Sequence, residues 1–212
     1  MESAFDFFDK MFCINLDERT DRWEICKKEF EKVGILDKVE RFSAVKDVDG
    51  RIGIIKSNLE IVKYAKENKL NNVLVFEDDV EFITDDTEGN LKKSLSQVGT
   101  LKWSLFYLGA NTHNKLLKIK PNLILIKNSY AVHAMAYNKV VYDNFIRKYE
   151  GMDRITKHSD ILDVYLAEQI QSKYVCLMTN PMLATQRNDY SDIEKREVNQ
   201  NYIEERFKKN IK

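Results

Sequence analysis

The stretch VLVFEDDVEF, residues 73–82, decides the fold of this chain. Four apolar residues, 73–76, run directly into three consecutive carboxylates, Glu77, Asp78 and Asp79. An uninterrupted apolar run of this kind is typical of a buried strand. Three carboxylates at the end of one strand repel one another unless positive charge lies among them. A hard divalent cation, which prefers carboxylate oxygens, is the expected neutraliser, and it would in turn hold a phosphate-bearing ligand.

The composition excludes several classes of protein. The 212 residues include 34 Lys and Arg and 34 Asp and Glu, so charge gives no reason to expect nucleic-acid binding. No apolar run approaches the roughly 20 residues that cross a bilayer, and we expect neither a transmembrane segment nor a secretory signal. The three scattered cysteines fit a reducing compartment, so we expect a cytoplasmic protein. The composition, rich in Lys, Asn and Ile, suggests a bacterial or viral origin.

The rest of the chain predicts alternating strands and helices. The expected strands cover residues 11–16, 39–45, 73–77, 103–108, 130–137 and 174–177, with a hairpin of 116–119 and 123–126. The expected helices cover residues 18–33, 54–68, 91–98, 139–149 and 161–170. This order predicts a single-domain α/β fold, with a mixed, mainly parallel sheet flanked by helices.

Basic side chains follow the first expected strand, in NLDERTDRW (15–23), which holds Asn15, Arg19 and Arg22. In α/β sheets ligands bind at the carboxyl ends of the strands, so these groups and the acid triplet should share one rim. The arginines could grip phosphate from one side and a carboxylate-bound metal from the other, which describes a diphosphate site. The alternatives are arginines paired with neighbouring acids on a solvated helix, and a loop of solvated carboxylates.

Five short blocks, in the same order along the chain, resemble glycosyltransferase family 25, which includes lipooligosaccharide and collagen galactosyltransferases. The blocks are CINLDERTDRW (13–23), VLVFEDDVEF (73–82), AVHAMAY (131–137), ILDVYL (161–166) and the spaced residues Pro181, Gln186 and Ser191-Asp192-Ile193. The resemblance implies a GT-A-like fold, a nucleotide-sugar donor (usually a UDP-sugar), a Mn²⁺ or Mg²⁺ ion, and inversion at the anomeric carbon. It divides the single domain into a donor-binding half (about 9–110), an acceptor-side half (about 111–195) and a C-terminal helix or tail (196–212).

The matching positions imply a set of site residues. The residues expected to bind the donor are Asn15, Arg19, Arg22, Glu77, Asp78, Gln186 and Asp192. Asp79 is the expected metal ligand, together with Glu77. The residues expected to contact the acceptor are Asn111, Tyr130 and His133, although a histidine on an aromatic-rich strand is more often a core residue.

Sugar transfer also needs a base for the acceptor hydroxyl. Asp163, in the fourth block, is the first candidate. Asp160 lies three residues earlier, so on one helix both carboxylates could face the same side. A helix cap is an equally good role for Asp160.

We therefore expect a metal-dependent inverting glycosyltransferase that moves galactose or glucose from a UDP-sugar to a hydroxyl. The acceptor would be a glycan, a glycolipid as in lipopolysaccharide biosynthesis, or a hydroxylysine-type group, and a lipid-linked acceptor would bring the protein to a membrane surface. One alternative is a nucleotidyltransferase, although the chain has only seven glycines and no glycine-rich phosphate loop. Another is a non-catalytic nucleotide-sugar-binding module, because Asn58 stands where the family has a histidine.

Overall fold

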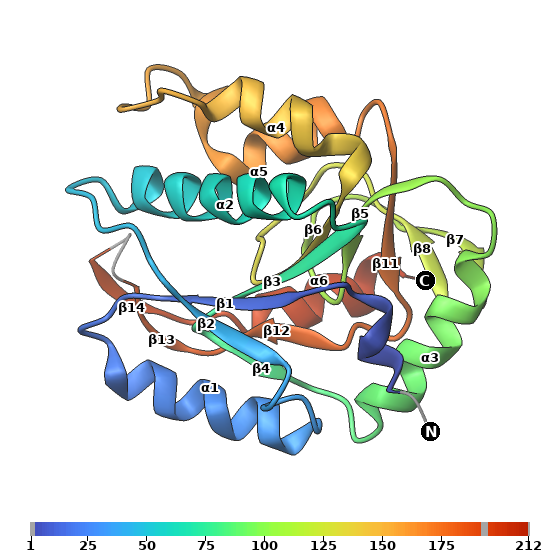
Figure 1. Ribbon diagram of the computed structural model, residues 1–212. Helices are drawn as coiled ribbons and strands as arrows, with labels where there is room; N and C mark the ends of the chain where they lie inside the picture. The colour runs from blue at the N-terminus through green and yellow to red at the C-terminus, as the bar shows by residue number, and fades with distance from the viewer. Residues whose placement is uncertain (1–2, 192–194, 212) are drawn as a thin grey trace.

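The computed structural model describes residues 3–191 and 195–211, and it is an α/β fold built on one central sheet (Figure 1). Within the described residues this sheet has eight strands. In spatial order they are β2 (Val39–Ser43), β1 (Met11–Asn15), β3 (Asn72–Glu77), β10 (Ala134–Asn138), β5 (Trp103–Tyr107), β11 (Val175–Thr179), β8 (Leu123–Leu125) and β7 (Leu117–Lys120). Only β10 and β8 run against the others, which confirms the predicted mixed, mainly parallel sheet.

Helices cover both faces of the sheet. The α-helices are α1 (Thr20–Lys32), α2 (Gly50–Glu67), α3 (Thr87–Val98), α4 (Tyr142–Tyr149), α5 (Leu162–Tyr165) and α6 (Tyr202–Asn210). Figure 1 shows α2, α4 and α5 on one face and α1 and α3 on the other, and each group buries its own apolar cluster against the strands. The fully buried run of β3 lies between these two clusters, as its uninterrupted apolar sequence predicts.

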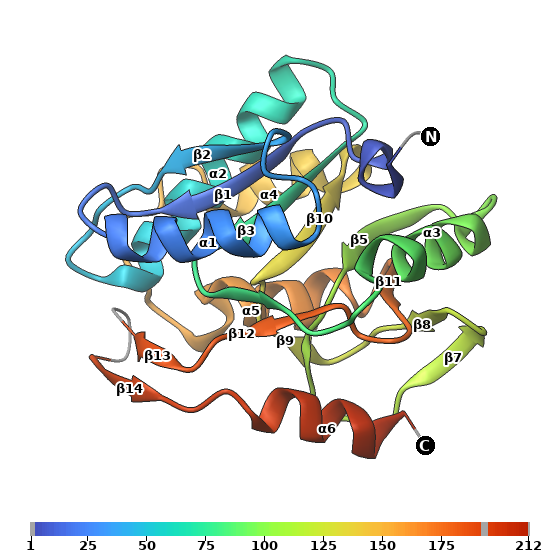
Figure 2. The ribbon, with the colours of Figure 1, turned by 90° about the horizontal axis from the view of Figure 1, so that it is seen from below.

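Short elements complete the fold. The 3-10 turns are Ala4–Phe7, Lys139–Val141 and His158–Asp160, and a π-helical turn covers Leu166–Ile170. The two-stranded pairs are β4 (Val80–Phe82) with β12 (Ala184–Gln186), β6 (Asn111–Thr112) with β9 (Ser129–Tyr130), and β13 (Asp189–Ser191) with β14 (Arg196–Val198). Figure 2 shows β12, β13 and β14 leading to α6, which packs against β6 and β12.

The pairing of β12 with β4 matters most for the site. β4 begins directly after the acid triplet, and its register places Gln186 opposite Val80. A segment more than a hundred residues further along the chain therefore lies beside the carboxyl end of β3.

Helix α2 begins earlier than the sequence predicts, at Gly50 and not at residue 54. The side chain of Asp49 accepts a hydrogen bond from the backbone N–H of Arg51 and caps the helix. Gly53 lies inside the helix, and a Cβ atom there would lie 2.7 Å from the carbonyl oxygen of Val45. The absence of a side chain at Gly53 lets the preceding loop pack closely on the helix. From the sequence alone, this glycine is expected to belong to a turn.

Other boundaries also differ from the prediction. Helix α3 begins at Thr87 because Asp86 caps it, so residues 87–90 are helical where a loop was expected. The strand expected over 130–137 is interrupted at Ala131, whose φ of 68° lies in the left-handed region, so β9 and β10 are separate. The helix expected over 161–170 divides into α5 and the π-helical turn, and the C-terminal region contains β14 as well as a helix. Among the described residues no helix is long and apolar enough to cross a bilayer.

Candidate functional site

A cavity of about 660 Å³ opens at the carboxyl ends of β1 and β3. Its walls come from these strand ends, the loop that precedes α2, the β6–β9 pair, the start of α5, and described residues between β12 and the start of α6. The predicted site residues that line it are Asn15, Arg22, Glu77, Asp78, Asp79, Asn111, Tyr130, Asp163 and Gln186. The structure therefore brings together most of the side chains that the sequence singles out, at the edge of the sheet where ligands bind in α/β folds.

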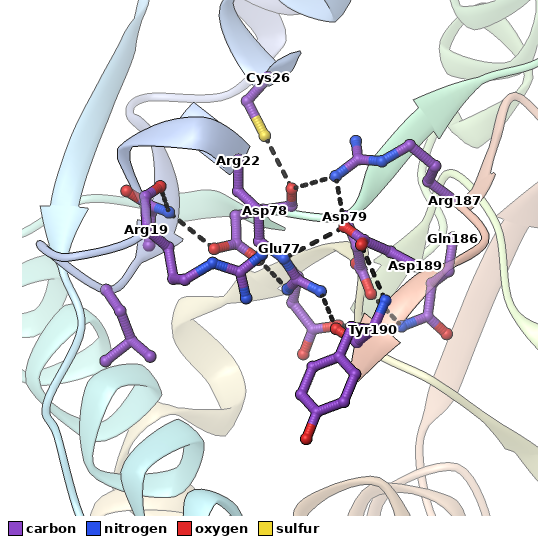
Figure 3. A network of polar contacts seen from close by, with 12 residues as sticks. Arg19, Arg22, Cys26, Glu77, Asp78, Asp79, Gln186, Arg187, Asp189 and Tyr190 are labelled. Carbon is purple, nitrogen blue, oxygen red and sulfur yellow. Dashed lines mark hydrogen bonds and ion pairs between the residues drawn. The ribbon is translucent and has the colours of Figure 1, made fainter. Parts of the chain in front are cut away.

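Glu77 and Asp79 form a half-buried acidic pair in this cavity. Burial and the charge of Asp78 raise the pKa of Asp79 to about 6. Burial and the charge of Asp79 raise the pKa of Glu77 well above its usual range. Gln186 Nε2 donates to Asp79 Oδ2 at 3.1 Å and reaches Glu77 Oε2 at 3.4 Å (Figure 3). The pair thus holds more negative charge than its surroundings neutralise.

One carboxylate oxygen in this pair has no hydrogen-bond partner. Asp79 Oδ1 is buried and accepts no hydrogen bond from the described residues. A buried carboxylate oxygen without a donor is costly, and a cation would satisfy it. Across the described part of the chain, no three His, Cys, Asp or Glu side chains converge to hold a metal by themselves. A cation bound here would take its other ligands from water and from a bound anion.

Asp78, the middle acid, has a different environment. Its Oδ1 lies 2.7 Å from Arg22 Nη1, and Asn15 Nδ2 donates to its Oδ2 at 2.7 Å. Cys26 donates from its thiol to the backbone carbonyl of Asp78, at 3.1 Å. Arg22 also donates to the carbonyl oxygen of Tyr190 at 2.5 Å, which ties β13 to the same point (Figure 3). Asp78 is therefore neutralised by protein groups and joins α1, β1 and the C-terminal segment.

The arginines divide between the cavity wall and the surface. Arg19, expected to bind the donor, pairs with Asp21 at 2.9 Å and does not line the cavity. Arg187, which the sequence reasoning missed, does line it. Its backbone N–H donates to Asp79 O at 2.7 Å, and its buried Nη1 has no partner among the described residues. The signal for Arg187 in the sequence is its position directly after Gln186, a residue that the sequence analysis singles out.

Asp163 and Asp160 occupy different environments. Asp163 lines the cavity at the start of α5, and its charge raises the pKa of Glu77. Burial raises the pKa of Asp163 itself, although backbone N–H groups that donate to its carboxylate oppose the shift. Asp160 is only 3% exposed and does not line the cavity. Its carboxylate accepts from Lys148 Nζ at 2.6 Å and from Thr156, so it fixes the loop before α5 rather than facing a ligand or capping α5.

The three residues expected to contact the acceptor also divide. Asn111 and Tyr130 face each other in the β6–β9 pair, and both line the cavity. His133 does not line it: its side chain is completely buried, with Nε2 3.2 Å from Ala184 O. Burial lowers the pKa of His133 to about 4, so the ring is neutral. His133 is a core residue, although its neighbours Ala131 and Val132 still line the cavity.

Asn58 and Asp192 are two further positions that the sequence singles out. Asn58 is 2% exposed and accepts a hydrogen bond from the hydroxyl of Tyr137 at 3.0 Å. It lies in the core and not on the cavity wall, so its difference from the family residue changes no cavity-lining group. Asp192, expected to bind the donor, lies outside the described residues.

Comparison with known proteins supports the fold. No protein-family model and no curated protein sequence matches this chain, so membership of glycosyltransferase family 25 stays a prediction. A solved glycosyltransferase involved in the glycosylation of the major capsid of PBCV-1 aligns with a TM-score of 0.50 and 10% identity, over 80% of this chain and 79% of that one. A197 from STIV aligns with a TM-score of 0.49 and 10% identity, over 91% and 94% of the two chains. A UDP-glucose pyrophosphorylase complexed with UDP-glucose aligns with a TM-score of 0.45 and 8% identity, over 80% and 72%. At 10% identity the likeness to the PBCV-1 glycosyltransferase shows a shared fold.

Proposed function

We propose that this protein is a metal-dependent glycosyltransferase that moves a hexose from a UDP-sugar to an acceptor hydroxyl. The observation that carries the proposal is the composition of one cavity. A half-buried carboxylate pair, Glu77 and Asp79, shares it with the guanidinium of Arg187 and with a separate carboxylate, Asp163. Its volume of about 660 Å³ falls within the range of small-molecule and cofactor sites.

The acidic pair fits a divalent cation that a diphosphate helps to bind. Asp79 Oδ1 is the free buried oxygen, and Glu77 supplies a second carboxylate. Magnesium and manganese at such sites commonly take only one or two protein carboxylates, with water and substrate phosphates as the other ligands. We propose Mn²⁺ or Mg²⁺ held by Asp79 and Glu77, where it would neutralise charge on the leaving diphosphate.

Arg187 also supports a diphosphate site, because it offers a hydrogen-bond donor inside the cavity. Its buried Nη1 lacks a partner among the described residues, and a phosphate oxygen would accept from it. Asn15 and Arg22 contribute by holding Asp78 in place, so that the pair on either side of it keeps its position. Preorganised charge of this kind stabilises a leaving group without rearrangement during the reaction.

Asp163 is the proposed general base. It lines the same cavity from α5, an element on the other face of the sheet from α1. Burial raises its pKa, which makes its carboxylate a stronger base toward an acceptor hydroxyl. A single base and no protein nucleophile are what a direct displacement needs, and direct displacement inverts the anomeric carbon.

The acceptor would enter beside Asn111 and Tyr130, which form the wall at the β6–β9 pair. We propose a glycan, a glycolipid or a hydroxylysine-type acceptor, with galactose or glucose as the transferred sugar. The cysteines Cys13, Cys26 and Cys176 are free thiols, which is consistent with a cytoplasmic location. A lipid-linked acceptor would place the protein at the membrane surface.

The direct test is incubation with a panel of nucleotide sugars, with Mn²⁺, with Mg²⁺ and with EDTA. We expect release of free UDP from UDP-galactose or UDP-glucose, dependent on the metal and faster with an acceptor. Release of pyrophosphate instead of UDP would indicate nucleotidyl transfer. Binding of UDP and Mn²⁺ without release of UDP from any donor would indicate a non-catalytic binding module.

A further inference from the structure

A second polar cluster lies where α6 meets β6 and β9. Tyr202 and Arg206 are four residues apart on α6, so they share one face of the helix. Asn111, Tyr130 and Tyr202 line the cavity. His113 follows β6, and its ring packs edge-on against Tyr130 with ring centres 5.0 Å apart. We call these five residues the acceptor-side rim: Asn111, Tyr130 and Tyr202 line the cavity, whereas Arg206 and His113 do not line it but contact residues that do.

Arg206 organises this rim. Its Nη1 donates to Asn111 Oδ1 at 2.9 Å and lies 3.2 Å from His113 Nε2. The guanidinium carbon lies 4.8 Å from the centre of the Tyr202 ring, in a cation–π contact. Asn210, one turn further along α6, donates to the carbonyl oxygen of Thr112 and fixes the helix along β6.

The contacts of Arg206 decide which groups the rim can offer to a ligand. Because an arginine side chain only donates hydrogen bonds, Asn111 must turn its Oδ1 toward Arg206 and its amide N–H groups away. For the same reason His113 Nε2 must be the acceptor, and its proton lies on Nδ1. Arg206 thus occupies acceptor atoms on both neighbours, and the rim presents mainly N–H donors.

The charge of Arg206 is not balanced by a nearby acid. No Asp or Glu in the described ranges, 3–191 and 195–211, forms an ion pair with it. Arginines on the other walls each pair with a carboxylate, namely Arg22 with Asp78, Arg51 with Asp49 and Arg187 with Asp189. The acceptor-side rim therefore carries net positive charge, while the end that holds Glu77 and Asp79 carries net negative charge.

We propose that the acceptor carries an anionic group, a carboxylate or a phosphate on a sugar, which binds to Arg206 and to the amide of Asn111. The aromatic faces of Tyr130 and Tyr202 would pack against the sugar ring beside that group. Arginine is the side chain best suited to planar carboxylates and to phosphates. This inference rests on the proposed glycosyl transfer and specifies the class of its acceptor.

The test compares acceptor analogues that differ only in charge. Protein is saturated with UDP and Mn²⁺, and the affinities of methyl β-D-glucuronide and methyl β-D-glucoside are measured by calorimetry. The affinities of glucose 6-phosphate and glucose are compared in the same way to test a phosphate group. We expect at least one anionic analogue to bind about tenfold more tightly than its neutral partner, the effect of one charge-assisted hydrogen bond. The pair of analogues with the larger preference identifies carboxylate or phosphate.

Variants then tie the preference to one residue. Arg206→Gln keeps a donor for Asn111 but removes the charge, and the preference should fall to about twofold or less. Arg206→Lys keeps the charge and should retain more of the preference. Lys208→Gln removes a cation from the same helix, about 200° around its axis, and should leave the preference unchanged.

The outcomes separate this inference from the proposed function. Suppose that the protein binds UDP and Mn²⁺ but binds charged and neutral analogues with equal affinity, or binds neither analogue. The inference of an anionic acceptor would then be wrong, and the proposed function would be unaffected. A preference that survives Arg206→Gln would also overturn the inference. Failure of the wild-type protein to bind UDP with Mn²⁺ would instead overturn the proposed function.

Discussion

Arg22 and Asp78 form a buried ion pair, with Nη1 of the arginine 2.7 Å from Oδ1 of the aspartate and side chains only 9% and 13% exposed. This pair separates the three consecutive acids into two kinds. Asp78 is neutralised by the protein and holds α1 against the end of β3, whereas Glu77 and Asp79 face the cavity without a cationic partner of comparable strength. Asp78 therefore has a structural role, whereas Glu77 and Asp79 are available to a ligand in the cavity.

Removal of Arg22 should therefore act mainly on stability. Arg22→Ala leaves the carboxylate of Asp78 buried without its cation, and breaking such a pair costs about 3–5 kcal/mol. Urea unfolding at pH 7 measures the loss. The control is Lys66→Ala, which removes a solvent-exposed ion pair with Asp143 and should cost less than about 1 kcal/mol. Equal effects of the two variants would show that the buried pair has no special role.

Replacement of Asp79 should act on ligand binding and not on stability. Asp79→Asn removes the proposed metal ligand, and metal-dependent binding of UDP should weaken by about 100-fold. The melting temperature without metal should not fall, because the raised pKa of Asp79 shows that its charge is unfavourable in the folded protein. Asp85→Asn, an exposed acid in the next loop, is the matched control. Undiminished UDP binding by Asp79→Asn would place the metal elsewhere.

Asp163 and Asp160 provide a second matched pair. Asp163→Asn should lower turnover by about 100-fold or more, with unchanged affinity for UDP and Mn²⁺, because only the proton acceptor is lost. Asp160→Asn should lower the urea midpoint, since it removes the partner of Lys148, and leave turnover of the folded enzyme unchanged. Steady-state kinetics and urea unfolding on both variants give the comparison. The reverse pattern would exchange the two roles.

The burial of His133 predicts a specific dependence of stability on pH. Its pKa is about 4 in the folded protein and near 6.5 in the unfolded chain, so below pH 6.5 the unfolded state gains a proton that the folded state does not. Its contribution is therefore present above pH 6.5 and is lost as the pH falls toward 4. The full difference in pKa corresponds to about 3 kcal/mol.

Comparison with a variant isolates this contribution, because the raised pKa values of Glu77 and Asp79 act in the opposite direction over the same range. Between pH 7 and pH 4.5 the wild-type free energy of unfolding should fall by about 2–3 kcal/mol more than that of His133→Gln. His158→Gln, at an exposed histidine, should behave like the wild type. Identical pH profiles for wild type and His133→Gln would show that His133 is not held neutral.

The parts of the site that the sequence predicts are those encoded locally. The apolar run before Glu77 is enough to predict a buried strand that ends in acids at a ligand-binding edge, and the cavity lies there. Arg187 could not be predicted in this way, because its position depends on β12 pairing with β4, more than a hundred residues earlier in the chain. The structure places His133 in the core although its neighbours Ala131 and Val132 line the cavity, and the sequence does not reveal where along this segment the wall ends.

The spacing of residues in the sequence also does not reveal which acid each arginine pairs with. Arg19 and Arg22 look equivalent in the sequence, three residues apart near the start of one helix. Arg19 pairs with Asp21 near the surface, whereas Arg22 is buried against Asp78. Which of them faces inward follows from how α1 packs on β3, a property of the tertiary fold.

The most direct test of the account is calorimetric titration of UDP into the wild-type protein, once with Mn²⁺ and once with EDTA. The proposed site, in which Glu77 and Asp79 share a cation with a diphosphate, predicts saturable one-to-one binding that is at least about tenfold tighter with Mn²⁺. Absence of binding in the presence of Mn²⁺, or the same affinity in both buffers, would contradict it.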